Sequence, residues 1–149
     1  MMQRCSQVSR EERGMTLPEV VISIAIGGLV FGGVLTAYVQ SAIRAEWAAY
    51  NLAGHSLALQ RLEQVRAAKW DTQSSPPVDL VVASNFPVTV DLLDIPISGT
   101  NITFATNFVA ISTVSSEPPL RLISVNTVWQ FRPGRLFTNT TASFRAPDQ

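Results

Sequence analysis

Thiol and imidazole groups are almost absent from this 149-residue chain, which has one cysteine, Cys5, and one histidine, His55. A single thiol cannot form a disulfide framework, and this pair cannot supply the four ligands of a typical zinc site. Charge is also scarce, because 11 basic and 11 acidic residues give a formal net charge of zero. Binding to nucleic acid depends on clustered positive charge, so we expect no nucleic-acid partner.

Groupings of residues that carry out catalysis are missing as well. The sequence has no histidine or cysteine cluster and no glycine-rich phosphate loop. Asp79, Asp91 and Asp94 raise the alternative of a calcium site, but they do not follow the spacing of an ordered calcium loop, so we expect solvated acids. The chain is therefore predicted not to be an enzyme, with no catalytic residues, no metal site and no cofactor.

What the chain does have is one long apolar run. No charged residue occurs from Val20 to Ile43, and most side chains there are aliphatic, glycine or alanine. A helix of about 20 apolar residues crosses a bilayer, whereas the apolar part of a secretory signal has about 7–15 residues. The polar leader, residues 1–14, carries three arginines against two glutamates, which favours a cytoplasmic N-terminus. We predict a single-pass membrane anchor.

Glu19 lies between the leader and the apolar run. A carboxylate in hydrocarbon costs a few kcal/mol, so it is kept where it has a partner. Cleavage after Gly14 would give Met15 a free amine four residues before Glu19, and that amine is a suitable counter-charge within one chain or between neighbours. Alternatively, Glu19 reaches the headgroups or offsets the helix dipole. Taken alone, the residue fits both interpretations.

The run Arg13–Val21, RGMTLPEVV, resembles the N-terminal signal of type IV prepilins and type II secretion pseudopilins. The resemblance implies that a prepilin peptidase cuts after Gly14 and methylates the new amine of Met15, and that Glu19 serves assembly. It also implies two further kinds of contact: other pilin or pseudopilin subunits through the N-terminal helix, and inner-membrane lipid. Pro18 departs from the usual aliphatic residue, but proline suits the first turn of a helix.

The helical pattern continues beyond the apolar run, over residues 44–70. Four apolar residues fall on or near one face at spacings of seven, three and three: Leu52, Leu59, Leu62 and Val65. We predict an amphipathic half of the helix whose apolar face packs on the chain's own C-terminal sheet. A helix that is half membrane anchor and half sheet cover is the architecture that the prepilin resemblance implies.

Strand-forming residues dominate the C-terminal part after a polar linker at 71–79. The expected strands cover residues 78–83, 88–93, 102–112, 120–131 and 136–144. In the clearest of them, Ile123, Val125, Trp129 and Phe131 share one face. An antiparallel sheet of about four strands needs a cover, which the helix provides, so we predict an α+β, pilin-like fold. The predicted parts are the leader 1–14, the hydrophobic half 15–43, the amphipathic half 44–70 and the β-sheet domain 71–149.

These features together predict a minor pilin or pseudopilin subunit of a type IV pilus or a type II secretion pseudopilus. Two segments, Leu59–Arg66 and Ser124–Trp129, resemble most closely the PilV-like or GspI-like minor subunits. The expected location is the bacterial inner membrane with the C-terminal domain extracytoplasmic, followed by the pilus or pseudopilus. The alternative is a single-span, membrane-anchored β-domain that binds a partner outside the membrane without polymerising.

Overall fold

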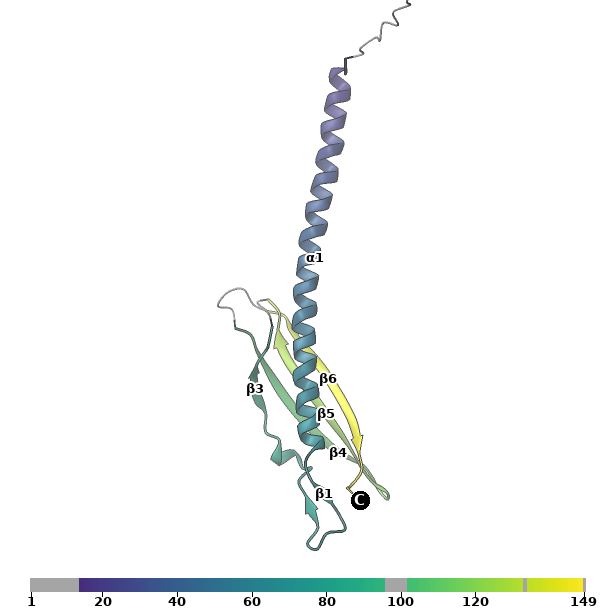
Figure 1. The fold of residues 1–149 in the computed structure, drawn as a ribbon, viewed down its shortest axis with the longest axis vertical. Coiled ribbons are helices and arrows are strands. Elements are labelled where there is room, and N and C mark those ends of the chain that lie inside the picture. Colours follow the sequence, from purple (N-terminus) through teal and green to yellow (C-terminus); the bar gives the residue numbers. More distant parts are fainter. Residues whose placement is uncertain (1–13, 96–101, 133, 149) are drawn as a thin grey trace, which may run out of the picture. The chain divides into compact units, whose positions relative to one another are not determined.

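The computed structural model describes residues 14–95, 102–132 and 134–148, and it divides into two compact units between Ala42 and Ile43. In the described part of the first unit, the only element is the beginning of helix α1 (Leu17–Arg66). The second unit holds the remainder of α1 and all the strands (Figure 1).

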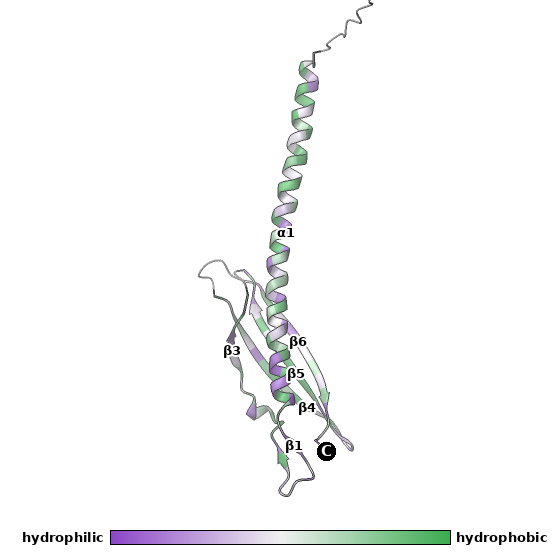
Figure 2. Ribbon diagram, viewed as in Figure 1, coloured by the Kyte–Doolittle hydropathy of each residue, from purple (hydrophilic) through white to green (hydrophobic). Residues whose placement is uncertain are grey.

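The first unit is an apolar helix without a protein covering. Helix α1 begins at Leu17, and the Thr16 carbonyl accepts the amide of Val20 at 3.2 Å. Every residue from Gly14 to Ala42 is exposed. The most apolar window of α1 has a mean hydropathy of 2.3, and Figure 2 shows hydrophobic colour along this part. Its length and composition fit a membrane span, so the predicted anchor is supported.

The second unit contains a four-stranded antiparallel sheet in the order β3-β4-β5-β6. Its strands are β3 (Thr89–Leu92), β4 (Phe104–Ser116), β5 (Pro119–Gln130) and β6 (Leu136–Arg145). Strand β4 has an irregularity in its register with β5 between Thr113 and Ser115. Within the described ranges, β6 is a ten-residue edge strand. The predicted α+β fold, with a long helix packed on an antiparallel sheet, is confirmed.

The segment expected to be a linker is partly ordered into a second, two-stranded ladder. Strand β1 (Trp70–Asp71) pairs with β2 (Val78–Asp79), and a short 3-10 helix η1 (Ala83–Asn85) follows. The expected strand over 78–83 is therefore wrong beyond its first two residues. The turn forms because the Asp71 carboxylate accepts the backbone amides of Gln73 and Ser74 at 3.0 and 2.9 Å, which also lowers its pKa.

The buried stripe of α1 differs from the predicted one. Leu62 and Val65 are buried, but Leu52 and Leu59 are 70% and 41% exposed. The remaining buried positions of α1 are two small residues, Gly54 and Ala58. The reason is close approach: a Cβ atom added at Gly54 would lie only 2.7 Å from Nε1 of Trp129. At Gly54 and Ala58 the helix therefore approaches the sheet through small residues, which a search for large apolar residues does not find.

The core has an aliphatic cluster and an aromatic cluster. The aliphatic cluster consists of Ala58, Leu62, Val65, Trp70, Val81, Ile123 and Val125. The aromatic cluster consists of Leu93, Ile95, Ala105, Trp129 and Phe131, with Tyr50, Ala53, Leu57 and Phe137 packed against it. The predicted inner face of β5 is confirmed, and it also carries the buried Thr127, whose hydroxyl donates to Asn107. Phe104 and Phe108 of β4, in contrast, are exposed.

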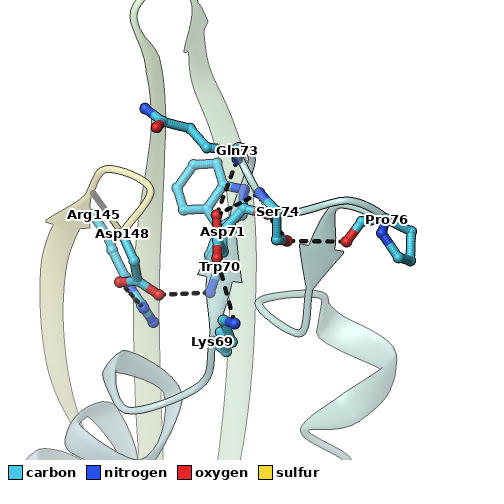
Figure 3. Close-up of polar contacts among 8 residues, drawn as sticks. All are labelled: Lys69, Trp70, Asp71, Gln73, Ser74, Pro76, Arg145 and Asp148. Atoms are coloured by element: carbon cyan, nitrogen blue, oxygen red, sulfur yellow. Dashed lines mark hydrogen bonds and ion pairs between the residues drawn. The ribbon is translucent and has the colours of Figure 1, made fainter.

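Polar contacts hold the C-terminal residues against the end of α1 (Figure 3). The Asp148 carboxylate accepts the Trp70 amide at 2.9 Å, and the Asp148 amide donates to the Trp70 carbonyl at 2.7 Å. Arg145 donates to Asp148 and to the carbonyl of Val65 in the last turn of α1. The hydrogen bond from Trp70, followed by that from Arg145, lowers the pKa of Asp148.

A second polar contact joins β2 to β5. Arg121 donates to both carboxylate oxygens of Asp79 at 2.7 Å and to the carbonyl of Val81 at 2.6 Å. Its guanidinium also lies over the Trp70 ring, 4.3 Å from the centroid. The Arg121 hydrogen bonds lower the pKa of Asp79, because they stabilise its charged form.

Candidate processing and assembly site

The predicted cleavage site lies immediately before α1, outside any helix or strand. Gly14, Met15 and Thr16 precede the helix, and all three are exposed, Met15 by 71%. No atom lies within 4 Å of a Cβ position built at Gly14. The peptide bond after Gly14 is therefore sterically open to an enzyme. The rest of the predicted leader, residues 1–13, including Cys5, lies outside the described residues.

Glu19 occupies the first turn of α1 and is exposed. With Thr16 as the residue before the helix, the sequence TLPE has the spacing of a capping box, and an acid there also complements the helix dipole. Met15 lies before the helix and, in the uncut chain, has no free amine. A structural role for Glu19 at the helix start is therefore compatible with a role toward a cleaved terminus.

The three acids considered for calcium have different surroundings. Asp79 pairs with Arg121, whereas Asp91 in β3 accepts hydrogen bonds from Thr89 and Asn107. Asp94 is exposed beyond the end of β3. Over the described ranges, no group of three or more potential metal-binding side chains comes together. The three acids do not converge on one site.

A small polar pocket lies between α1 and β3, and the sequence did not indicate it. Its volume is about 120 Å³, and its lining residues are Leu57, Gln60, Arg61, Gln64, Thr89, Asp91 and Asn107. Arg61 donates to Gln64 at 2.8 Å and to the carbonyl of Pro87 at 2.9 Å. In β3, the polar residues Thr89 and Asp91 alternate with apolar ones, but this pattern does not say which strands pair.

The fold and the site define a class: a membrane-anchored α+β protein whose apolar helix follows an exposed glycine. The comparison with protein families then matches residues 9–35 to the prokaryotic N-terminal methylation motif. The match covers Gly14, Met15 and Glu19 and ends within the first unit. The resemblance to type IV prepilins is thereby confirmed at the N-terminus. Comparisons with curated proteins and with solved structures gave no match.

Proposed function

We propose that this chain is a precursor that is cut after Gly14, methylated at Met15 and assembled through α1, with Glu19 as the assembly carboxylate. The product is a minor pilin or pseudopilin subunit, of the PilV-like or GspI-like kind, in a type IV pilus or a type II secretion pseudopilus. It acts as a structural subunit rather than an enzyme. Its partners are the prepilin peptidase and other pilin or pseudopilin subunits.

One observation carries the proposal: the methylation motif covers the start of a helix whose residues 17–42 are all exposed. A purely soluble protein would leave this apolar surface in water, which is unfavourable at roughly 25 cal/mol per Å². Lipid covers the surface in the precursor, and neighbouring helices cover it after assembly. A cleavable leader is suited to a protein that passes from the first environment to the second.

Processing is tested on the membrane-purified protein by N-terminal sequencing and mass spectrometry. We expect a chain that begins at methylated Met15. The variant Gly14→Val should retain the leader, and because Gly14 has no neighbour within 4 Å, the fold should not change. An intact leader on functional protein would contradict the proposal.

Assembly is tested with Glu19→Val, which removes a charge that is costly in hydrocarbon. The variant should stay in the membrane fraction and be lost from the filament or pseudopilus fraction. Glu63→Val is the matched control, because Glu63 is also an exposed acid of α1 but lies in the second unit. If Glu19→Val is incorporated as well as the control, Glu19 has no role in assembly.

The second candidate is an anchored binding domain that does not polymerise. The exposed apolar side chains Val90, Leu92 and Phe104 on the outer face of the sheet are the observation in its favour. Both candidates require the membrane anchor, and they differ at the N-terminus. Removal of the leader and loss of assembly in Glu19→Val support the subunit, whereas an uncut, functional monomer supports the binding domain.

A further inference from the structure

The turn between β5 and β6 presents two arginines at its tip. The Phe131 amide donates to the Arg135 carbonyl at 3.0 Å, and the Arg135 amide donates to the Arg132 carbonyl at 3.3 Å. Arg132 has a φ of +60° and Gly134 a φ of +89°, so the chain reverses within a few residues. The guanidinium groups of Arg132 and Arg135 lie 5.4 and 5.8 Å from the ring centroids of Phe131 and Phe137.

This hairpin packs against the first turns of α1 in the second unit. A guanidinium nitrogen of Arg132 lies 3.6 Å from a carboxylate oxygen of Glu46. The ring centroids of Phe137 and Trp47 are 6.0 Å apart, and those of Phe131 and Tyr50 are 5.3 Å apart. Glu46 is only three residues beyond the end of the uncharged run, which is about 5 Å of helix at 1.5 Å per residue. The hairpin therefore contacts the part of α1 that directly follows the uncharged run in the sequence.

The exposed side chains at this end have the composition of a membrane interface. Arg132 is 51% exposed despite its contact with Glu46, and Arg44 and Arg135 are also exposed. Leu136, next to Arg135, is 70% exposed and Trp47 is 37% exposed. Arginine, tryptophan and an exposed aliphatic group together favour the headgroup region, where the rings and alkyl stems lie in apolar surroundings and the charges reach phosphate.

The charge at this end is positive although the chain as a whole is neutral. Arg44, Arg132 and Arg135 are exposed on the hairpin and on the adjoining turn of α1, and the acid among them, Glu46, is already paired with Arg132. An arginine close to an anionic bilayer surface gains about 1 kcal/mol, which corresponds to roughly a fivefold change in a binding equilibrium. Two arginines on one hairpin are therefore sufficient to bias the position of the second unit.

We propose that the β5–β6 hairpin is a docking surface for anionic lipid headgroups. Arg132 and Arg135 bind the lipid phosphates, while Leu136 and Trp47 enter the headgroup layer. The surface holds the second unit against the bilayer before any assembly. The inference rests on the membrane anchor alone, so it can hold or fail independently of cleavage after Gly14 and of the role of Glu19.

The test is hydrogen exchange, followed by mass spectrometry, of the full chain in lipid nanodiscs at one copy per disc. Discs of phosphatidylcholine alone are compared with discs that also contain phosphatidylglycerol. We expect amides 131–137 to exchange about fivefold more slowly in the anionic discs, and high salt to remove the difference. Equal exchange in the two kinds of disc overturns the proposal, as does protection that appears only with two copies per disc, because that would indicate a subunit contact.

Variants separate lipid binding from the ion pair. R132Q/R135Q should lose the lipid-dependent protection while near-ultraviolet circular dichroism shows an intact fold. E46Q breaks the same ion pair but leaves the end more positive, so it should keep or increase the protection. If E46Q loses protection as R132Q/R135Q does, the ion pair rather than the lipid holds the hairpin, and the proposal is wrong. R66Q, at the far end of α1, should behave as wild type.

Discussion

The two parts of α1 share one backbone but are built for different surroundings. Residues 17–42 are exposed throughout and apolar on all sides, whereas residues 43–66 bury a narrow stripe at Gly54, Ala58, Leu62 and Val65. An all-round apolar helix requires lipid or other helices, and a one-sided helix requires a sheet. The comparison shows that the pattern around the helix, more than its total hydrophobicity, indicates its environment.

The comparison should be clearest when the same truncation is made in both parts. Leu62→Ala removes a side chain that is 4% exposed and should lower the free energy of unfolding by about 3 kcal/mol. Leu35→Ala removes a side chain that is 52% exposed in the first unit and should change that free energy by less than about 0.5 kcal/mol. Chemical unfolding of the full chain in mild detergent, followed by near-ultraviolet circular dichroism, measures both. Equal losses would contradict the difference between the two parts.

Two glycines of α1, one in each unit, allow a second comparison between the two parts. Gly54→Ala places a Cβ atom 2.7 Å from Trp129 Nε1 and 2.8 Å from Asn139 Oδ1, so strain should outweigh the gain in helix propensity. We expect a net loss of about 1–2 kcal/mol in the same unfolding experiment. Gly28→Ala is the control, because nothing lies within 4 Å of its added methyl group. A stabilised Gly54→Ala variant would show that the helix can move away from the sheet at little cost.

Acid sensitivity should arise mainly in the second unit, because Glu19 is the only carboxyl group in the described part of the first. Arg121 holds the pKa of Asp79 in the folded protein below its usual value. The contribution of Asp79 to the free energy of unfolding is therefore complete above about pH 4, and it is lost as the pH falls through this lowered pKa. Asp79→Asn should cost about 1 kcal/mol at neutral pH, reduced from a buried pair by partial exposure.

The measurement is the free energy of unfolding between pH 7 and pH 3 for wild type and Asp79→Asn. The variant should lose less stability on acidification than wild type. Its free energy of unfolding should still fall somewhat with pH, because the pKa values of Asp71 and Asp148 are also lowered. Glu63→Gln, which alters an exposed pair with Arg66, serves as the control. An unchanged pH slope in Asp79→Asn would rule out a stabilising role for the Arg121 pair.

The smallest effect is expected at a position within the second part of α1. Leu52 is 70% exposed, so Leu52→Gln should change the free energy of unfolding by no more than about 0.5 kcal/mol. Parallel unfolding curves for this variant and Leu62→Ala give the comparison directly. A loss at Leu52 as large as that at Leu62 would restore the leucine stripe predicted from the sequence.

The sequence predicts the features that depend on neighbouring residues. The anchor, the position of the motif at Gly14 and Glu19 and the inner face of β5 follow from local runs and from period-two alternation. The candidate site is one continuous segment, so its residues can be found without knowledge of the fold. The α+β layout, which was predicted from the same local patterns, is confirmed by the structure.

Features that depend on distant residues were missed. The Arg121–Asp79 pair joins residues 42 positions apart, and Asn139 connects Asn51 of α1 to Trp129 of β5 through its side chain. The stripe was misassigned because hydrophobic periodicity gives weight to leucine, whereas close approach selects glycine. The strand expected over residues 78–83 ends at Asp79 because its partner β1 is only two residues long, and the run of strand-forming residues does not reveal the length of a partner strand.

The free edge of β6 has a practical consequence for anyone producing this protein. Ten residues, Leu136–Arg145, present unpaired backbone groups along one side within the described sheet, and no proline or lysine interrupts them. Such an edge is a template for another strand. Copies anchored in one bilayer diffuse in two dimensions with a common orientation, so crowding during overproduction brings like edges together. Expression level, more than the choice of detergent, should therefore decide whether the preparation yields dispersed protein or strand-paired aggregates.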